Sequence, residues 1–189
     1  MMSVSVHYFE KPGPKNTEAT LQAVKARAGE LGIKQIVVAS NTGRTAFAAA
    51  QLMPEMARII GVTEAAGWWG TDTPPDPETI AQAEAVGVRF VTATHGLMGA
   101  VEWAMQETFG GLPPVELIAR TYYTVSSGTK VAIECLLMAA DAGLLAMHED
   151  AITIAGTGKG ADTAMVVKPT FSNKFFDLRI REFLAMPRV

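Results

Sequence analysis

The chain has 189 residues, of which 49% are hydrophobic and 19% charged, so it is long and apolar enough for one globular domain with a substantial core. Its 16 basic and 19 acidic residues give a net charge of −3, and no basic run offers a surface for nucleic acid. The single cysteine, Cys135, excludes an internal disulfide, and no signal peptide or membrane-length apolar stretch is present. We therefore expect a cytoplasmic protein without a membrane or nucleic-acid partner.

Strand and helix patterns alternate along the chain. Continuous or period-two apolar runs indicate strands, and apolar residues three and four apart between capping signals indicate helices. The N-cap of the first helix is predicted at Asn16 and its end at Gly32. The predicted strands are residues 3–9, 36–39, 58–63, 88–94, 151–155 and 164–168, and the predicted helices are residues 17–31, 46–53, 77–86, 96–109, 116–123 and 128–142.

This alternation predicts an α/β fold with a mostly parallel sheet covered by helices on both faces. The last two predicted strands follow one another through a short loop, so one edge of the sheet is expected to be antiparallel. No linker or repeat divides the chain, which indicates a single domain over residues 1–189. In such sheets ligands bind beyond the carboxyl ends of the strands. The positions to search are residues 40–45, Thr63, His95 and residues 156–162.

The strongest candidate site is segment 40–46, Ser-Asn-Thr-Gly-Arg-Thr-Ala, which follows a buried strand and opens a helix. Unpaired N–H groups and the positive end of the helix dipole favour an anion there, and Gly43 lets the backbone approach it closely. The hydroxyls add donors, and the Arg44 guanidinium offers a planar fork for phosphate. The alternative is an ordinary helix cap with a solvated arginine. The predicted phosphate site comprises Ser40, Asn41, Thr42, Gly43, Arg44 and Thr45.

A second candidate is the Gly-rich segment 156–162, Gly-Thr-Gly-Lys-Gly-Ala-Asp. Its spacing formally meets the dinucleotide-binding fingerprint, but a strand follows where that motif requires a helix, and the spacing is not that of a P-loop. A turn between two strands and a ligand-contacting loop both remain open. In the second case Lys159 would neutralise phosphate and Asp162 would accept a ligand hydrogen bond, beside Gly156, Thr157, Gly158 and Gly160.

Other polar residues have weaker signals. His95 ends a predicted strand, where it would be a general base, a ligand contact or a structural residue. The histidines, the cysteine and the carboxylates show no metal-ligand spacing, so no metal site is predicted. Residues 126–130, Ser-Ser-Gly-Thr-Lys, fit a helix cap and a second anion contact equally well. Glu134 and Asp141 share a helix face, expected to be the solvated one, with a pocket lining as the alternative.

Aromatic and apolar residues in two regions suggest further contacts. Trp68 and Trp69 lie in a predicted loop, where they would stack on a planar ring, pack on the protein or form a subunit contact. The predicted helix over residues 131–142 is apolar on nearly all sides. The tail from Phe175, which fits either a helix or a strand, carries three phenylalanines. We therefore expect a homo-oligomer.

Residues 36–46, Ile-Val-Val-Ala-Ser-Asn-Thr-Gly-Arg-Thr-Ala, resemble the C-terminal α/β domain of pyruvate kinase, where the corresponding loop holds a phosphate of an allosteric effector. The sequence is more closely similar to a family of small stand-alone proteins called pyruvate kinase C-terminal domain-like. The similarity covers nearly the whole chain through short segments that are specific in combination. They are Tyr8-Phe-Glu-Lys-Pro-Gly, Asn16-Thr-Glu, Thr20-Leu, Val38-Ala-Ser, Gly43, Thr45-Ala, His95, Gly99, Glu102, Lys130-Val, Glu134, Met138-Ala-Ala-Asp-Ala-Gly, Gly160-Ala-Asp-Thr-Ala and Met186-Pro-Arg.

The resemblance implies a three-layer α/β/α fold and a pocket suited to flavin mononucleotide (FMN), with its phosphate on residues 40–45. It does not imply pyruvate kinase activity, because the catalytic barrel and its metal-binding carboxylates have no counterpart in this sequence. Two functions are therefore open: an FMN-binding protein, whether or not it is an enzyme, and a non-catalytic effector or sensor module for a phosphosugar or another phosphometabolite. A phosphosugar-converting enzyme that uses His95 with Glu102 or Asp162 is a weaker alternative.

Overall fold

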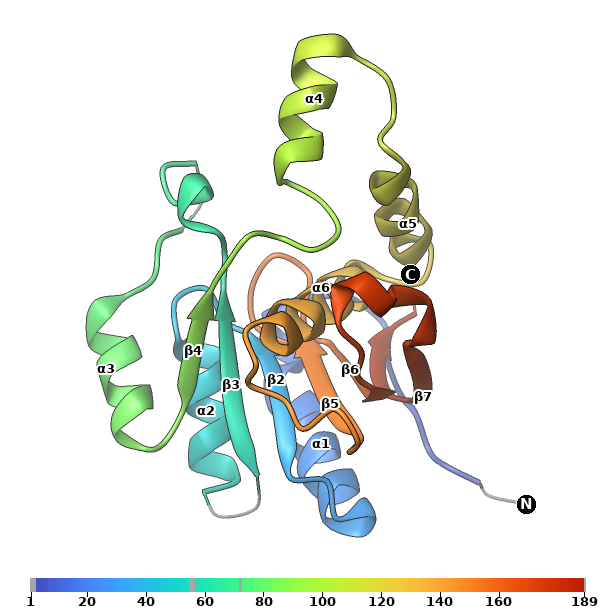
Figure 1. Ribbon diagram of the computed structural model, residues 1–189. Helices are drawn as coiled ribbons and strands as arrows, with labels where there is room; N and C mark the ends of the chain where they lie inside the picture. The colour runs from blue at the N-terminus through green and yellow to red at the C-terminus, as the bar shows by residue number, and fades with distance from the viewer. Residues whose placement is uncertain (1–2, 55–56, 72, 189) are drawn as a thin grey trace.

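The computed structural model describes residues 3–54, 57–71 and 73–188, which form one mixed sheet of seven strands between two layers of helices (Figure 1). The strands lie in the spatial order β1-β7-β6-β5-β2-β3-β4. Their bounds are β1 His7–Phe9, β2 Gln35–Ala39, β3 Arg58–Thr63, β4 Arg89–Thr92, β5 Ala151–Ala155, β6 Thr163–Lys168 and β7 Arg179–Pro187.

Most strand pairs are parallel, and both antiparallel pairs involve β6. β2 pairs in parallel with β3 on one side and with β5 on the other, and β3 pairs in parallel with β4. β6 is antiparallel to β5 and to β7, and the short β1 closes that edge by pairing in parallel with β7. The predicted α/β class and the mostly parallel sheet with antiparallel pairing toward one edge are confirmed.

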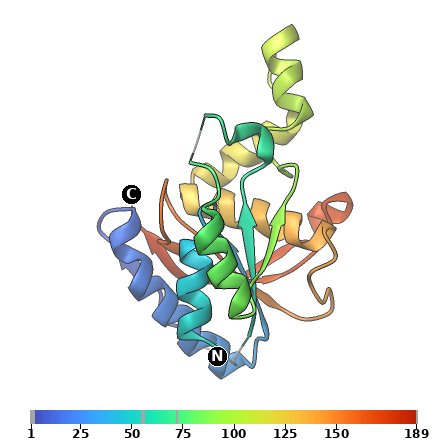
Figure 2. The same ribbon diagram turned by 90° about the vertical axis from the view of Figure 1, so that its left-hand side faces the viewer.

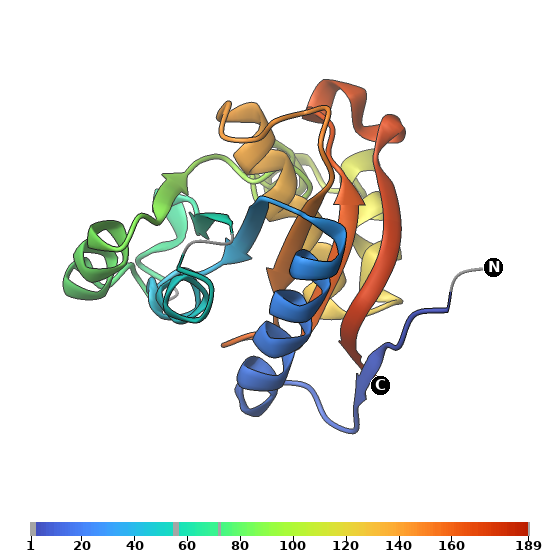
Figure 3. The ribbon, with the colours of Figure 1, turned by 90° about the horizontal axis from the view of Figure 1, so that it is seen from below.

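Helices cover both faces of the sheet. On one face α1, α2 and α3 lie next to one another (Figure 2), and α6 lies on the other side of the strands from α1 (Figure 3). This is the three-layer arrangement that the resemblance implies. The α-helices are α1 Thr17–Leu31, α2 Arg44–Leu52, α3 Pro77–Ala85, α4 Val101–Phe109, α5 Pro114–Tyr123 and α6 Ser127–Asp141, and 3₁₀ helices span Pro14–Asn16, Ala66–Trp68 and Ser172–Asp177.

Two clusters of buried apolar residues form the core, one on each face of the sheet. The first joins Ile36 and Ile152 of the sheet to Val24 of α1. The second joins Val37 and Ile60 to α6. Neighbouring residues of β2 therefore belong to different clusters, because successive side chains of a strand point to opposite faces. The continuous apolar run of this strand follows from its burial on both sides.

α6 is apolar on most of its surface because the rest of the chain covers it. Its residues from Ala132 to Ala140 are all buried, most of them in the core cluster on this face of the sheet. Beside it, Tyr122 of α5 and Phe175 pack edge to face, with 6.4 Å between their ring centroids. The apolar pattern over residues 131–142 is therefore explained within one chain and does not itself indicate a subunit contact. The homo-oligomer stays a prediction.

α4 stands clear of the three layers (Figures 1 and 2) and buries none of its residues. The predicted helix over residues 96–109 begins only at Val101, because the preceding residues form a loop in which Gly99 has a φ of 94°. Val101, Met105 and Phe109 are exposed and four residues apart, so they form one apolar stripe. None of the helices within the described residues is both long and apolar enough to cross a membrane.

The chain ends and the helix caps differ in part from expectation. The strand predicted over residues 3–9 is reduced to β1, and the tail forms a 3₁₀ helix followed by β7. Gly32 ends α1 with a φ of 66°, as predicted. Asn16 precedes α1, but its side chain donates to the Lys11 carbonyl oxygen (2.8 Å) and accepts no hydrogen bond from an N–H group of the helix.

Candidate functional site

The carboxyl ends of β2, β3, β4 and β5 lie at the same edge of the sheet, because these strands are mutually parallel. The chain runs from β2 to β3 and β4 on one side, and later places β5 on the other side of β2. Such a reversal leaves a crevice between the loops that follow the two central strands, where open α/β sheets bind ligands. These loops are residues 40–45 and 156–162, so the two predicted segments are neighbours.

Residues 40–45 form a turn with free N–H groups at the start of α2. The Ser40 hydroxyl accepts a hydrogen bond from the Ala46 N–H (3.0 Å), which satisfies one donor of the helix end. Arg44 is exposed at the same turn. Within this turn, four N–H groups have no hydrogen-bond partner among the described residues: those of Asn41, Thr42, Arg44 and Thr45. Unpaired donors at a helix N-terminus attract an anion.

Gly43 has a φ of 88°, a left-handed conformation that favours glycine. A Cβ atom at this position would lie 3.0 Å from Ile80 Cδ1 and 3.2 Å from Thr79 Cγ2, both in the first turns of α3. The close approach that Gly43 permits is therefore between α2 and α3. The expected approach of its backbone to an anion stays a prediction.

The Gly-rich loop between β5 and β6 packs on the start of α1. Gly160 has a φ of 68°, and a Cβ atom there would overlap the Thr17 hydroxyl, which accepts a hydrogen bond from the Ala161 N–H (2.9 Å). A Cβ atom on Gly156 would lie 2.5 Å from the Gly160 carbonyl oxygen. The glycines are thus needed for the tight course of the loop itself.

Asp162 is fully buried and holds this loop to the rest of the fold. Its Oδ2 accepts hydrogen bonds from the N–H groups of Gly13 (2.9 Å) and Thr157 (3.1 Å), and its Oδ1 accepts one from the Thr163 hydroxyl (2.9 Å). Neither Asp162 nor Thr157 lines the cavity over this edge of the sheet. Their contact with a ligand stays a prediction, whereas the hydrogen bonds show a structural role for Asp162.

A cavity of about 860 Å³ opens at the carboxyl edge of the sheet, a volume typical of small-molecule sites. It brings together most of the predicted site residues, namely Ser40, Asn41, Thr42, Arg44, Thr45, Thr63, His95, Gly156, Gly158, Lys159 and Gly160. Much of its remaining wall is apolar and comes from the loops after β3 and β4 and from α4 and α6. That part includes Trp68, Met98, Trp103, Val131 and Met138.

Two tryptophans form one side of the cavity. Trp68 packs edge-on against Trp103 of α4, with 5.9 Å between ring centroids and 76° between ring planes, and its Nε1 donates to the Gly99 carbonyl oxygen (3.0 Å). Trp69 does not line the cavity, and its Nε1 donates to the Glu64 carbonyl oxygen (2.9 Å). Trp68 therefore contributes a wall, and Trp69 secures the loop that carries it.

His95 and Asn41 tie the loops of the cavity together. His95 Nε2 accepts a hydrogen bond from the Ala65 N–H (3.1 Å), so its Nδ1 carries the proton that it donates to the Met98 carbonyl oxygen (3.1 Å). The Asn41 side-chain oxygen accepts from the Glu64 N–H (3.0 Å), and its amide nitrogen donates to the Glu64 carboxylate (3.4 Å). The polar atoms of both side chains are engaged in positioning the cavity walls.

Residues 18–167 match the family model described as pyruvate kinase, alpha/beta domain. The chain belongs to this family. The matched part includes the loops after β2 and β5 and the whole of α6. The cavity is built almost entirely from it, since Pro14 and Thr17 are the lining residues that precede residue 18.

This α/β-domain protein also carries a buried ion pair in the cavity wall. Lys130 Nζ donates to Glu134 Oε2 one turn along α6, and each side chain is 6% exposed. Glu134 Oε1 accepts hydrogen bonds from the N–H groups of Leu97 and Met98 (3.0 Å each). The expectation that Glu134 lies on the solvated side of its helix is wrong, although Asp141 is exposed. The four-residue spacing of Lys130 and Glu134 indicates an ion pair on one helix face. The burial of this pair, however, arises from tertiary packing.

Two further features of α6 are structural. Burial raises the pKa of the Cys135 thiol, and the neighbouring Glu134 charge raises it further, so this cavity-lining thiol stays protonated and is a poor nucleophile. The Ser126 hydroxyl accepts a hydrogen bond from the Thr129 N–H (2.9 Å). Of the two interpretations of residues 126–130, the helix cap is therefore observed.

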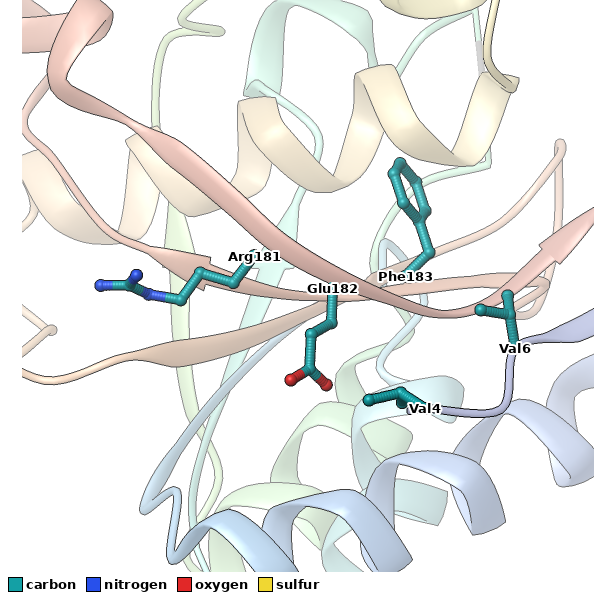
Figure 4. Close-up of a pocket in the computed structure, with 5 residues that line it drawn as sticks. All are labelled: Val4, Val6, Arg181, Glu182 and Phe183. Carbon is teal, nitrogen blue, oxygen red and sulfur yellow. The ribbon is translucent and has the colours of Figure 1, made fainter. Parts of the chain in front are cut away.

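Other parts of the molecule offer little to a ligand. Across residues 3–54, 57–71 and 73–188, no group of three or more His, Cys, Asp or Glu side chains is arranged to hold a metal ion. A hollow of about 340 Å³ lies beside β7, where Glu182 and Phe183 point to opposite faces of the strand (Figure 4). Glu182 accepts two hydrogen bonds from Arg27 (2.8 Å each), which lower the pKa of its carboxyl. We assign no ligand to this hollow.

Proposed function

We propose that this protein binds a phosphorylated small molecule with a planar ring, and that FMN is the ligand that fits the site best. One observation carries the proposal. A single cavity of about 860 Å³ joins the free N–H groups at the start of α2 to a wall that contains Trp68 and Trp103. The first end suits a phosphate, and the second end suits an aromatic ring.

The charges of the lining support an anionic ligand. Arg44, Lys130 and Lys159 outnumber the two carboxylates, which belong to Glu64 and Glu134. Arg44 lies at the free end of α2 and Lys159 is exposed on the Gly-rich loop, so both are available to a phosphate that enters from solvent. Charge-assisted hydrogen bonds from an arginine fork are among the stronger contacts a phosphate makes.

The size and apolar character of the cavity favour a flavin over a small phosphosugar. A phosphosugar buries less apolar area against the indole rings of Trp68 and Trp103 than a flavin ring would. When bound, FMN supplies redox chemistry, while the residues of this chain bind it, orient it and exclude water. The family match supports a second candidate, a non-catalytic effector module for a phosphosugar, which needs only the phosphate end of the cavity.

Titration of the purified protein with FMN and with riboflavin tests the proposal, using flavin fluorescence and the shift in melting temperature. FMN is expected to bind more tightly than riboflavin, because riboflavin lacks the phosphate. A ligand at a hundred times its Kd adds about 2.7 kcal/mol to the free energy of unfolding. If neither flavin changes either signal, the FMN assignment is wrong. A phosphosugar that stabilises the protein more than FMN would favour the effector module.

The Arg44→Ala variant tests where the phosphate lies. Loss of one charge-assisted hydrogen bond is expected to weaken FMN about tenfold to a hundredfold and to leave riboflavin nearly unaffected. The matched control is Arg89→Ala, which removes an exposed arginine at the start of β4, away from the cavity lining. Equal losses for FMN and riboflavin would mean that Arg44 supports the fold or the ring, and that the phosphate binds elsewhere.

A further inference from the structure

Lys130 and Glu134 are charged residues in the most buried helix of the protein. Each side chain is 6% exposed, and the intervening residues Ala132 and Ile133 are fully buried. Removing two charges from water is costly, and a buried ion pair is often no more stabilising than apolar residues of similar size. Stability alone therefore gives a weak reason for this pair, and its position in the cavity wall suggests a role in binding.

Glu134 uses both of its acceptor oxygens, whereas, among the described residues, Lys130 uses only some of its donors. Glu134 uses both oxygens: Oε1 accepts from the Leu97 and Met98 N–H groups, and Oε2 accepts from Lys130. An ammonium group has three donors. One goes to Glu134, and in the described part of the chain no other acceptor lies within hydrogen-bond reach of Lys130 Nζ. The Tyr123 ring, 5.9 Å from Nζ, covers another side of the ammonium.

We propose that Lys130 is a ligand-binding residue that donates a hydrogen bond to a carbonyl or anionic oxygen on the ring of the ligand, and that Glu134 is its positioning residue. This inference rests on the proposed function and deepens it, because it gives the cavity a second polar subsite on the α6 wall. The first subsite, on α2, takes the phosphate. A ligand that satisfies both carries a phosphate and a ring with an electron-rich oxygen, as the pyrimidine ring of a flavin does.

The way Glu134 is held supports its positioning role. Its hydrogen bonds to the Leu97 and Met98 N–H groups fix the carboxylate against the loop after β4. The fixed carboxylate in turn keeps the long, flexible lysine side chain in one place. Pre-positioned donors lose less conformational entropy when the ligand binds.

The Lys130→Met variant tests the subsite, because methionine keeps much of the apolar stem and removes the charge. Affinity is expected to fall about tenfold or more for FMN and by a similar factor for riboflavin, since both have the same ring. This pattern differs from that of Arg44→Ala, which affects FMN alone. Lys168→Met, an exposed lysine at the end of β6, is the matched control and should bind both flavins as the parent does.

The reduction potential of the bound flavin gives a readout that a merely structural role would not produce. Negative charge on the ring increases on reduction, so a nearby cation raises the potential and a nearby carboxylate lowers it. Lys130→Met is expected to lower the potential, and Glu134→Gln is expected to raise it. Shifts of the same sign in both variants would contradict direct action of the two charges on the ring.

A folding control is built into the same series. The Lys130→Met/Glu134→Gln double variant leaves no unpaired buried charge, so it remains measurable if Lys130→Met unfolds. Unchanged flavin affinity in a folded variant that lacks Lys130 overturns the subsite and leaves the FMN proposal standing. If the parent binds no flavin but is stabilised by a phosphosugar, the FMN proposal fails. If that phosphosugar stabilises the parent and the double variant equally, the ligand-binding role of Lys130 is also wrong. If no phosphorylated probe binds the parent, both proposals fail.

Discussion

Buried polar side chains of the fold are matched to fixed partners, one residue at a time. Gln35 is fully buried, and its amide exchanges two hydrogen bonds with the Ala146 backbone, at 2.9 and 3.0 Å. Asp162 accepts from Gly13, Thr157 and Thr163 in the same manner. A buried donor that loses its acceptor costs about 1–3 kcal/mol. Substitutions at such residues are therefore expected to act first on stability.

Asp162→Ala is expected to lower the free energy of unfolding by at least about 2 kcal/mol, because the Gly13 and Thr157 N–H groups lose their acceptor. Denaturant unfolding measures the change. The matched control is Asp141→Ala, since Asp141 is exposed and accepts one hydrogen bond, from the Ser172 N–H (3.0 Å). If Asp162→Ala unfolds at the same denaturant concentration as the parent but no longer binds flavin, Asp162 acts in ligand binding instead.

Among the elements, the contact of α2 with α3 depends on the backbone at Gly43. The cap of α3 is Asp76, whose carboxylate accepts from the Thr79 hydroxyl (2.8 Å) and the Glu78 N–H (3.2 Å); the Thr79 hydrogen bond is the main cause of its lowered pKa. This capped turn packs directly on Gly43. The turn at residues 40–45, where we propose that the phosphate binds, is therefore held in place by the start of another helix.

Gly43→Ala is expected to destabilise the protein more than Gly87→Ala does. Both glycines have a positive φ, 88° and 94°, which costs an alanine about 1–2 kcal/mol. A Cβ atom at Gly43 also meets Ile80 and Thr79, whereas nothing lies within 4 Å of one at Gly87. The difference in melting temperature between the two variants measures the contribution of the contact between α2 and α3. If Gly43→Ala weakens FMN binding without changing the melting temperature, Gly43 acts in phosphate binding instead.

The elements were more predictable from the sequence than the site. β3 has the predicted bounds, because an apolar run between polar residues depends on local pattern alone. The turn between β2 and α2 was predictable because a strand followed by hydroxyls, a glycine and a helix start is also a local pattern, and its phosphate binding stays a prediction. Burial of Lys130 and Glu134 was not predictable, since it requires the loop after β4 to pack on α6. The partners of Asp162 are likewise set by distant segments.

On the scale of the whole molecule, α4 is the α-helix among the described residues that buries none of its side chains. It projects beyond the layers (Figure 1), and its stripe of Val101, Met105 and Phe109 is 73%, 56% and 82% exposed. Large contiguous apolar patches on a protein surface mark sites of association. We propose that the expected homo-oligomer forms through this stripe.

Sedimentation at micromolar concentration is expected to show a species larger than the 20.1 kDa monomer, and Phe109→Asp is expected to dissociate it. Phe176→Asp is the matched control, because Phe176 is 80% exposed but lies near β7. If Phe176→Asp alone dissociates the oligomer, the interface lies at the tail. A parent protein that sediments only as a monomer would contradict the proposal altogether.

The neighbouring positions of β2 and β5 have a consequence for how the chain folds. Ile36 pairs with Ile152 in the sheet, although β3, β4 and the five α-helices from α2 to α6 separate them along the described chain. The two sides of the binding crevice therefore meet only after a very long loop has closed, which is a slow and entropically costly step. Partly folded chains carry one side of the crevice without the other. A ligand that contacts both sides binds only after the sheet is complete. Its binding therefore raises the free energy of global unfolding as well as that of local opening.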